Sequence, residues 1–463
     1  MKDYDVVVIG SGPGGYTTAI RATQLGFKTA IVERDRLGGI CLNWGCIPTK
    51  ALLKNAELMN GFKHLDSYGL SVENIKFDFD KIIARSRGVA DTSEKGVKYL
   101  MKKNKIDVFE GSAYINKDKT ITVKNKEGKE TDVLKAKHTI IATGARARPL
   151  GNLKFDEKKV LSSTGAMILK ELPKKMTIVG SGAIGVEFAY FYNAFGTEVT
   201  IVEMMPTIMP IEDKDISDVV AREFKKSGIK ILTDTKTESV EVKGGKVTTK
   251  VSGKNTEDLV SDVVLIAIGV QGNTENIGLE DLGVTVEKGS IKVDKDYKTN
   301  VEGLYAIGDV NGPPWLAHVA SSEGINCIEK IKGMHVPDID YTIIPGCTYC
   351  QPQVGSVGLT EKKALEEGYE IKVGKFPFSA SGKSRALGET AGMVKVIFDK
   401  KYDELLGAHI VGVEATELIM EFVLAKSLEA THEQILKTMH AHPTLAEANM
   451  EAVGVAYGEA INI

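Results

Sequence analysis

The sequence has no marked excess of charge of either sign. It contains 59 Lys and Arg residues against 62 Asp and Glu residues, which gives a formal net charge of -3. This balance provides no basic surface for nucleic acid, so we expect no nucleic-acid partner. No uninterrupted apolar run approaches the length of about 18 residues that spans a bilayer, so we expect no membrane association. The first residues resemble neither a signal peptide nor a transit peptide, so we expect a soluble, cytoplasmic protein.

Cysteine is also scarce, with five in 463 residues. In a reducing compartment, a cysteine pair is more often catalytic than structural. Cys41 and Cys46 are five residues apart, and in an ideal helix their Cα atoms would lie about 8.6 Å apart. A disulfide requires about 4.4–6.8 Å, so the two can be joined only across a distorted turn, which Gly45 permits. The alternatives are a buried thiol pair or half of a zinc site, but two thiolates cannot complete the usual four ligands, and we predict no metal.

The other cysteines have simpler interpretations. Cys327 lies in a helical pattern and is predicted to be a core residue. Cys347 and Cys350 form a CxxC motif without a thioredoxin-like βαβ context. We interpret them as structural thiols, and a second redox centre is the alternative.

The chain contains an internal repeat. Four pairs of residues match, each with the second number larger by 170: Gly10 and Gly180, Gly15 and Gly185, Gly26 and Gly196, Glu33 and Glu203. Each copy has the pattern GxGxxG after an apolar strand, then a helical segment, then a strand that ends in glutamate. This is the fingerprint of a βαβ dinucleotide-binding unit, so the repeat predicts two dinucleotide sites.

The two glutamates indicate how the dinucleotides are recognised. Glu33 and Glu203 can each accept a hydrogen bond from ribose hydroxyls; the alternative is a surface charge at the end of a strand. A carboxylate would repel a 2′-phosphate, and Met204-Met205-Pro206 supplies no arginine to receive one. The second site is therefore predicted to bind NAD rather than NADP.

Further patterns define the domains. Two apolar strands end at Gly144 and Gly269. A third apolar strand, Gly303–Asp309, ends in the acid Asp309, which we expect to face a cofactor. From about residue 341, alternating strands precede a long helical segment, 416–428, which predicts an α+β domain. The fold is predicted to be α/β, with two Rossmann-like dinucleotide-binding domains, the first of them split, and a C-terminal α+β domain.

The motifs together resemble one family. GGxCLNxGCIPxK at residues 38–50, both fingerprints, AIGD at 306–309 and HPTxxE at 442–447 occur in the order seen in the flavin-dependent pyridine nucleotide-disulfide oxidoreductases. The resemblance covers essentially the whole chain. It implies an FAD-binding domain in residues 1–145 and 270–342, an NAD-binding domain in 146–269 and a dimerisation domain in 343–463.

The resemblance also implies cofactor-binding residues. For FAD they are Gly10, Gly12, Gly14, Gly15, Glu33, Lys50, Thr143, Gly144, Asp309, Ala317 and His318. For NAD they are Gly180, Gly182, Gly185, Glu203 and Gly269. The stretch 269–274 lacks the arginine-proline pattern common in the family after this strand, which bears on nucleotide affinity.

Catalytic roles follow from the same resemblance. Cys46 would be the thiol nearest the flavin, in a charge-transfer pair with it, and Cys41 would exchange with substrate. His442 would be the base, oriented by Glu447. A capping box formed by Thr444 and Glu447 is the alternative interpretation of that glutamate.

Two further features lie close to this centre. Lys50 would lie near the flavin N5 and pair with Glu187. Trp44 is bulkier than the residue common at its position in the family, and we expect it to shape the flavin side of the turn.

Within the family, the motifs are most similar to those of members that oxidise dihydrolipoamide with NAD in 2-oxoacid dehydrogenase or glycine cleavage complexes. A homodimer is then implied, with each active site shared between subunits. No lipoyl-bearing segment precedes Met1, so the lipoyl group would come from an acyltransferase or carrier protein. The alternatives are a glutathione-reductase-like or mercuric-reductase-like enzyme and a non-catalytic docking flavoprotein. A glutathione-reductase-like enzyme would require an NADP-reading arginine, and a mercuric-reductase-like enzyme would require a C-terminal cysteine pair; this sequence shows neither.

Overall fold

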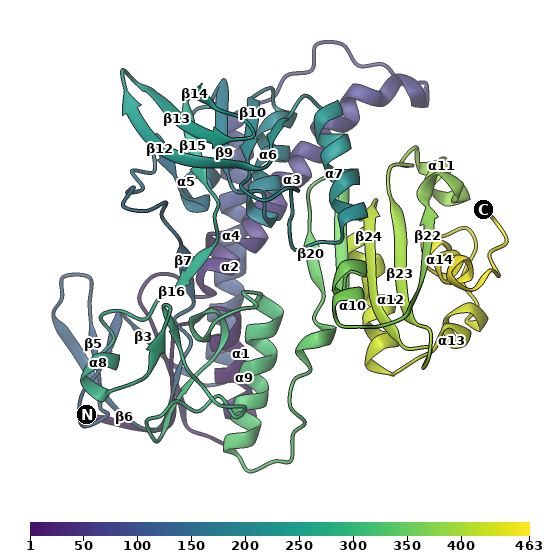
Figure 1. Cartoon of the computed structure of the whole chain (residues 1–463). Coiled ribbons are helices and arrows are strands. Elements are labelled where there is room, and N and C mark those ends of the chain that lie inside the picture. The colour runs from purple at the N-terminus through teal and green to yellow at the C-terminus, as the bar shows by residue number, and fades with distance from the viewer. The chain divides into compact units, whose positions relative to one another are not determined.

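The computed structural model describes residues 1–463 (Figure 1). By internal contacts it divides into two compact units, which are described separately. The first comprises residues 1–52, 80–148 and 269–339, and the second comprises 53–79, 149–268 and 340–463. Residues 53–79 lie within the range predicted for the first dinucleotide-binding domain, but by their contacts they cluster with the second unit.

The first unit is built on a seven-stranded sheet. Its parallel part runs in the order β3 (Asp107–Glu110), β2 (Thr29–Glu33), β1 (Lys2–Ile9), β6 (Glu130–Ile141) and β19 (Leu304–Ala306). Strands β4 (Ser112–Ile115) and β5 (Ile121–Lys124) extend it in antiparallel fashion. Val6, Val7 and Val8 of β1 are fully buried, as expected for a parallel strand covered on both faces.

Helices cover this sheet and carry its motifs. They are α1 (Pro13–Gln24), α2 (Gly39–Asn43), the start of α3 (Cys46–Gly61), α4 (Phe79–Lys103), the short α8 (Leu279–Leu282) and α9 (Ala317–Ile331). Helices α1 and α9 pack closely because glycines face the contact: a Cβ on Gly14 would lie 2.9 Å from the Ala320 carbonyl oxygen, and one on Gly324 would lie 2.0 Å from Thr18 Oγ1. This packing holds the first fingerprint against the start of α9.

The second unit contains a parallel sheet with the same topology. The order is β11 (Lys230–Leu232), β10 (Glu198–Val202), β9 (Lys175–Val179), β15 (Val263–Ile266) and β8 (Val160–Leu161). Val6 of β1 pairs with Thr29, and Met176 of β9 pairs with Val199, so the register repeats with the spacing of 170. The sequence repeat is therefore a repeat of structure, in which β9, α6 (Ala183–Ala194) and β10 match β1, α1 and β2.

Two further sheets complete this unit. Strands β12 (Thr235–Lys243), β13 (Lys246–Gly253) and β14 (Glu257–Ser261) form an antiparallel sheet. The C-terminal part has a five-stranded antiparallel sheet in the order β20 (Gly346–Thr348), β21 (Gln353–Gly358), β24 (Leu405–Gly412), β23 (Met393–Asp399), β22 (Ile371–Pro377). Its helices include α10 (Glu361–Glu366), α11 (Gly382–Leu387), α12 (Ala415–Ser427), α13 (His432–Lys437) and α14 (Glu447–Tyr457). The predicted fold class is confirmed.

A buried ion cluster ties α7 (Lys214–Lys226) to the C-terminal sheet within the second unit. The Lys395 side chain, 2% exposed, lies 2.7 Å from Asp213, 2.6 Å from Asp215 and 2.6 Å from Glu361. Asp213 also caps α7 by accepting the Asp215 N–H. An ammonium group is tolerated at such depth only when carboxylates surround it, so this cluster fixes the end of the loop that follows Glu203.

Glu212, beside this cluster, gives a pH-dependent prediction. Burial raises the pKa of Glu212 to about 7, and Asp213 adds to this, while a hydrogen bond from Ser356 opposes it. The folded state therefore binds a proton that the unfolded state has lost, and stability falls as pH rises from about 4.5 to about 7. Glu212→Gln is expected to increase the free energy of unfolding by about 1–2 kcal/mol at pH 8 and by less at pH 5.5, measured by denaturant unfolding.

The exposed Glu198, which pairs with Lys175 at 2.9 Å, provides a matched control. Glu198→Gln is expected to change the free energy of unfolding only slightly, because exposed ion pairs contribute little to stability. An equal stabilisation by Glu212→Gln at both pH values would contradict the prediction.

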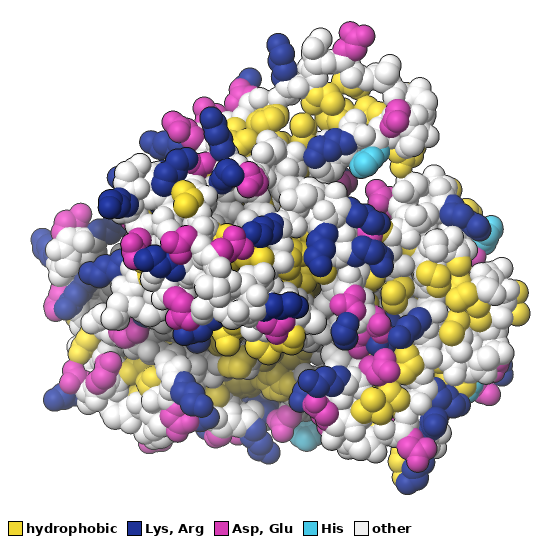
Figure 2. All heavy atoms as spheres, turned by 45° about the horizontal axis from the view of Figure 1, so that its top comes forward, with side chains coloured by type: hydrophobic (Ala, Val, Ile, Leu, Met, Phe, Trp, Pro, Cys, Tyr) yellow, Lys and Arg dark blue, Asp and Glu magenta, His cyan; other side chains and the backbone are white.

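The surface agrees with the balanced composition. On the face drawn in Figure 2, basic and acidic side chains are interspersed and no large area of one sign is present. None of the helices combines the length and the apolar character that a membrane crossing requires.

Candidate functional site

The two glycine fingerprints have the same geometry. Gly12 and Gly182 are the N-cap residues of α1 and α6, both extended, with φ -61° and -67°, and neither helix start receives a side-chain cap. A Cβ on either glycine would meet no atom within 4 Å. The approach to each helix N-terminus is therefore open, as the pyrophosphate of a dinucleotide requires.

The flanking glycines are crowded instead. A Cβ on Gly15 would lie 2.0 Å from the Gly10 carbonyl oxygen, and one on Gly185 would lie 2.1 Å from that of Gly180. These glycines bring helix and strand together. Each fingerprint thus has one glycine that leaves space for a ligand and others that the fold itself requires.

This difference gives a prediction for the second site. Gly182→Ala is expected to fold normally, because its methyl group meets no protein atom, yet to weaken NAD binding at least about tenfold by occupying the ligand's approach. Gly185→Ala is expected to lower the melting temperature because of its clash with Gly180. Titration calorimetry and thermal unfolding distinguish the two, and unchanged NAD affinity in Gly182→Ala would contradict the assignment.

Glu33 and Glu203 lie at the ends of β2 and β10. Each accepts hydrogen bonds from the serine inside its own fingerprint: Ser11 Oγ donates to Glu33 at 2.6 Å, and Ser181 Oγ donates to Glu203 at 2.7 Å. Both carboxylates are thereby held beside the glycine motif. No sequence motif singled out these serines, although their spacing of 170 is a signal.

The two cysteines lie on either side of a break between helices α2 and α3. Helix α2 ends at Asn43, Trp44 has φ -137°, and α3 begins at Cys46. Gly45 closes the turn: its carbonyl oxygen accepts the Thr49 N–H at 3.1 Å, and a Cβ there would lie 3.2 Å from the Ile40 carbonyl oxygen. The predicted distortion between Cys41 and Cys46 is present.

No disulfide joins Cys41 and Cys46 in this structure. The hydrogen bond to the Cys46 side chain, together with burial, raises the pKa of Cys41, whereas Lys50 acts to lower it. Cys46 is the first residue of a 16-residue helix, whose dipole favours a thiolate there. Burial and the Cys46 contact thus favour a proton on Cys41, and the start of α3 favours negative charge at Cys46.

The cysteine segment contacts the first fingerprint directly. The Gly38 N–H donates to the Ser11 carbonyl oxygen at 3.0 Å. A Cβ on Gly39, which has φ 59°, would lie 2.7 Å from the Gly12 Cα. Since Gly12 faces the predicted FAD pyrophosphate, the segment that carries the thiols starts beside the cofactor cradle.

Helix α4 holds the cysteine turn through three consecutive side chains. They donate hydrogen bonds to backbone carbonyl oxygens: Arg85 Nη1 to Ala51 at 3.0 Å, Ser86 Oγ to Pro48 at 2.8 Å and Arg87 Nη1 to Asn43 at 2.6 Å. No motif in the sequence singled out these residues.

Trp44 is fixed between two partners. The Arg87 guanidinium lies 4.1 Å from its ring centroid, and its indole Nε1 donates to Asp35 at 3.2 Å. A cation over the ring and an anion at its edge define one orientation of the indole. The bulky residue therefore contributes to the rigidity of the turn.

The acid delivered by the third strand is Asp309. It lies in a 3₁₀ turn, Gly308–Asn311, that follows β19. Burial raises the pKa of Asp309 to about 6, and the charge of Glu323 adds to this. Glu323 in turn accepts the Gly308 N–H at 2.7 Å. Glu323, a residue that the sequence did not indicate, thus holds the turn that presents Asp309.

The other predicted FAD residues lie in the same unit. Thr143 Oγ1 donates to the Asn273 carbonyl oxygen at 2.8 Å, and Asn273 Nδ2 returns a bond to the Thr143 carbonyl oxygen at 2.9 Å. Gly144 follows with φ 68°. Ala317 and His318 are the first residues of α9. Their contact with FAD stays a prediction.

His442 and Glu447 are hydrogen-bonded. His442 Nδ1 lies 2.8 Å from Glu447 Oε1, and the Thr444 N–H donates to the other oxygen at 2.8 Å. Burial acts to raise the pKa of Glu447, but these two hydrogen bonds bring it below its usual value. Glu447 is itself the first residue of α14, so it supports the turn after Pro443 and the imidazole at once. The contact with His442 is therefore present, whereas the capping box is not complete: the N-cap of α14 is Ala446, and the Thr444 hydroxyl donates to the Ala441 carbonyl oxygen.

Several predicted pairs of residues are divided between the two compact units. Lys50 belongs to the first unit and Glu187 to the second, so their pairing stays a prediction, as does the approach of His442 to the cysteines. Gly269 is likewise in the first unit, whereas the second fingerprint is in the second. Glu187 is 4% exposed, and its Oε1 accepts the Tyr349 N–H at 3.0 Å.

The remaining cysteines have separate surroundings. Cys350 is fully buried and its Sγ lies 3.3 Å from the Pro352 carbonyl oxygen. Cys347 Sγ lies 3.9 Å from the Thr416 carbonyl oxygen. Cys327 is fully buried, as expected for a core residue. The CxxC motif forms no disulfide in this structure.

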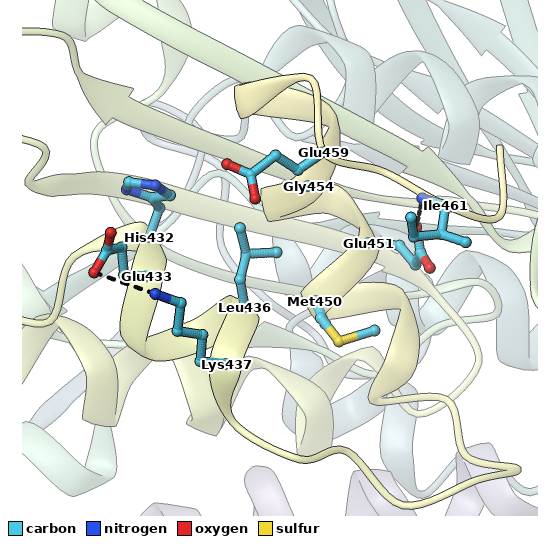
Figure 3. Close-up of a pocket in the computed structure, with 9 residues that line it drawn as sticks. All are labelled: His432, Glu433, Leu436, Lys437, Met450, Glu451, Gly454, Glu459 and Ile461. Atoms are coloured by element: carbon cyan, nitrogen blue, oxygen red, sulfur yellow. Dashed lines mark hydrogen bonds and ion pairs between the residues drawn. The ribbon is translucent and has the colours of Figure 1, made fainter.

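A pocket in the C-terminal part lies apart from these residues. It is lined by α13, α14 and the last residues of the chain, among them His432, Lys437, Met450 and Ile461 (Figure 3). The Lys437 ammonium and the Glu433 carboxylate pair across its edge at 3.7 Å. No residue predicted to bind FAD or NAD lines this pocket.

The fingerprint geometry fits the two predicted cofactors. In each copy, the N-cap glycine leaves space for a pyrophosphate at the start of the helix. A glutamate that accepts a hydrogen bond from the fingerprint serine lies at the end of the next strand. These are the recognition elements for a phosphate and a ribose. The first copy would hold FAD and the second NAD.

Family models agree with this arrangement. Residues 4–324 match the family model of the pyridine nucleotide-disulphide oxidoreductases, and residues 344–453 match the dimerisation domain of the same family. Dihydrolipoyl dehydrogenases from Rhizobium etli, Zymomonas mobilis and Bacillus subtilis are 51%, 49% and 42% identical to this chain. The alignments cover 100%, 99% and 99% of this chain, and 99% of each relative.

Solved structures share the fold. The crystal structure of LpdA from Mycobacterium tuberculosis matches with a TM-score of 0.90 over 98% of this chain and 99% of that one, at 23% identity. RclA, an HOCl-induced flavoprotein disulfide reductase from Escherichia coli, matches with a TM-score of 0.86 at 28% identity, over 98% of this chain and 100% of that one.

Proposed function

Because the chain belongs to the pyridine nucleotide-disulphide oxidoreductase family, we propose that it oxidises dihydrolipoamide to lipoamide and reduces NAD, with FAD as the bound flavin. The observation that carries the proposal is the contact between the cysteine segment and the first fingerprint, where Gly39 lies against Gly12. A redox pair attached to a dinucleotide cradle can pass electrons between a dithiol and a bound cofactor.

The protein's part begins with the oxidised Cys41–Cys46 pair. A substrate thiolate attacks Cys41 Sγ, which forms a mixed disulfide and releases Cys46 as a thiolate. The second substrate thiol then attacks its own partner sulfur, which closes the lipoamide disulfide and frees Cys41. The substrate loses two electrons and two protons; the electrons go to the cysteine pair.

Each of the two protons that the substrate loses needs an acceptor in the protein. Glu447 engages Nδ1 of His442, which leaves Nε2 to take the proton from the attacking substrate thiol. The other proton stays on Cys41, in agreement with the raised pKa of that thiol. Cys46 keeps its negative charge at the N-terminus of α3.

When bound, FAD would supply the two-electron acceptor for the dithiol, and NAD would supply the hydride acceptor. The residues of this chain contribute to electron transfer by positioning the two cofactors. Gly12 and Gly182 leave room for the two pyrophosphates, and Glu33 and Glu203 accept from ribose hydroxyls. Glu203, with no arginine after it, favours NAD over NADP.

A steady-state assay of the purified protein tests the function. Turnover with dihydrolipoamide and NAD is expected, and little is expected with glutathione disulfide and NADPH. No turnover with the first pair would refute the proposal, and preferential use of the second would favour a glutathione-reductase-like enzyme.

The shared active site is a finer proposal. The match of residues 344–453 to a dimerisation domain supports a homodimer. In each site, the cysteines would come from one subunit and His442 from the other. The lipoyl groups would be carried by acyltransferase or carrier proteins of a 2-oxoacid dehydrogenase or glycine cleavage complex, in the cytoplasm.

Complementation tests this arrangement. Cys41→Ser and His442→Gln chains, co-expressed with different tags and purified as the mixed dimer, would contain one intact site out of two if the site is shared. Activity of about half the wild-type value is then expected. A mixed dimer that is as inactive as either parent would show that both groups come from one subunit.

A further inference from the structure

In each fingerprint, the residue between the first two glycines is a serine. Ser11 lies between Gly10 and Gly12, and Ser181 lies between Gly180 and Gly182. Both serines are fully buried. Their surroundings can be compared bond by bond, because the fold repeats with the same spacing.

In the first copy, two donors of Ser11 converge on one carboxylate oxygen. The Ser11 N–H donates to Glu33 Oε2 at 2.9 Å, and Ser11 Oγ donates to the same oxygen at 2.6 Å. The Asp35 N–H donates to Oε1 at 2.9 Å. The carboxylate is therefore fixed by three protein donors.

The second copy repeats this set. The Ser181 N–H and Oγ donate to Glu203 Oε2 at 3.0 Å and 2.7 Å. The Met205 N–H donates to Oε1 at 2.9 Å. Met205 and Asp35 occupy equivalent positions, two residues after their glutamates, so the whole hydrogen-bond pattern has been kept in both copies of the repeat.

Each serine hydroxyl also receives a hydrogen bond from the loop beyond the glutamate. The Gly38 N–H is shared between the Ser11 carbonyl oxygen and Ser11 Oγ, which it reaches at 3.2 Å, and the Met209 N–H is shared in the same way with Ser181, reaching Oγ at 3.2 Å. With one acceptor position used by the loop, the hydroxyl donates its proton to the carboxylate. The serine is thus polarised in one direction in both copies.

Counting acceptor positions shows what remains for a ligand. A carboxylate offers about four lone-pair positions, two on each oxygen. In both copies the protein uses both positions on Oε2 and one on Oε1. We propose that Ser11 and Ser181 are positioning residues, which orient Glu33 and Glu203 so that the last position on Oε1 accepts the 2′-hydroxyl of the dinucleotide's adenosine ribose.

This inference rests on the proposed assignment of the fingerprints to FAD and NAD, and the second site offers the sharper test. Ser181→Ala is expected to raise the Kd for NAD by about tenfold, measured by calorimetry on the purified holoprotein. The Kd for an NAD analogue that lacks the 2′-hydroxyl of the adenosine ribose is expected to stay as in the wild type, because the analogue does not use Glu203.

Ser162 provides a matched control in the same unit. It is also buried, its Oγ donates to a glutamate, Glu157, at 2.7 Å, and it caps the short helix α5 (Ser163–Met167). Ser162→Ala is expected to lower the melting temperature without changing the Kd for NAD. A structural role alone would make Ser181→Ala behave in the same way.

The Glu203→Ala background separates this inference from the proposed function. If Ser181 acts through Glu203, the serine substitution has no further effect on the Kd for NAD once the glutamate is removed. An equal effect in both backgrounds, or an equal loss of affinity for NAD and the deoxy analogue, would overturn the positioning role. An unchanged Kd in Glu203→Ala itself would overturn instead the assignment of Glu203 to NAD.

Discussion

Cys41→Ser is expected to abolish dihydrolipoamide oxidation, by on the order of 10⁴-fold or more, while the protein retains its FAD. The substrate thiolate needs a disulfide sulfur to attack, and serine oxygen cannot form one. The flavin cradle is built from the fingerprint and from Glu33, so it does not depend on the Cys41 side chain. Steady-state rates and the flavin absorbance of the same sample measure the two effects together.

The other thiols provide the controls for this experiment. Cys347→Ser removes a half-buried thiol outside the predicted site and is expected to leave turnover unchanged. Full lipoamide activity in Cys41→Ser would show that the exchange thiol lies elsewhere, with Cys347 and Cys350 as the next candidates. Cys46→Ser should match Cys41→Ser in turnover, because either change prevents formation of the disulfide.

His442→Gln is expected to decrease turnover by about 10²–10⁴-fold, since the substrate dithiol then lacks its base. Glutamine keeps a polar side chain near Glu447 but cannot take up the proton. The expected loss is confined to the half-reaction with dihydrolipoamide. Reduction of the protein by NADH, followed by stopped-flow absorbance, should remain close to the wild-type rate.

Glu447→Gln extends the test to the residue behind the imidazole. Glu447 Oε1 holds His442 Nδ1 at 2.8 Å and so determines which nitrogen is left for substrate. The substitution keeps the size of the side chain but removes the charge that stabilises the imidazolium, so a smaller decrease than in His442→Gln is expected. A decrease in melting temperature without a change in the dithiol half-reaction would mean that Glu447 serves only the turn at Thr444.

Particular residues show how much of the fold could be predicted from the sequence. The buried run Val6–Ile9, the glycines at fixed spacing and the acids at 33 and 203 predicted two βαβ units, because parallel strands and tight phosphate turns impose local patterns. The alternating strand pattern predicted after residue 341 is also present, in β23 and β24. Residues 53–79 cluster with the second unit instead, and contacts between segments distant in sequence leave no local pattern that could have predicted this.

The site shows a similar division. The spacing of Cys41 and Cys46 around Gly45 predicted a distorted turn, and helices α2 and α3 are interrupted there. No pattern predicted that Arg85, Ser86 and Arg87 would hold that turn, because their partners are backbone carbonyl oxygens. Backbone atoms carry no sequence identity, so such contacts become visible only in three dimensions.

The sequence by itself determined the chemistry available to this protein: a reducible cysteine pair, two dinucleotide fingerprints and a histidine followed by a carboxylate. These follow from residue types at short, fixed spacing, where covalent geometry limits what the chain can do. Only the tertiary structure decided how those groups are held: Ser11 on Glu33, Glu323 beneath the turn of Asp309, and Gly39 against Gly12. Such contacts join segments that are distant in sequence, and packing alone selects them.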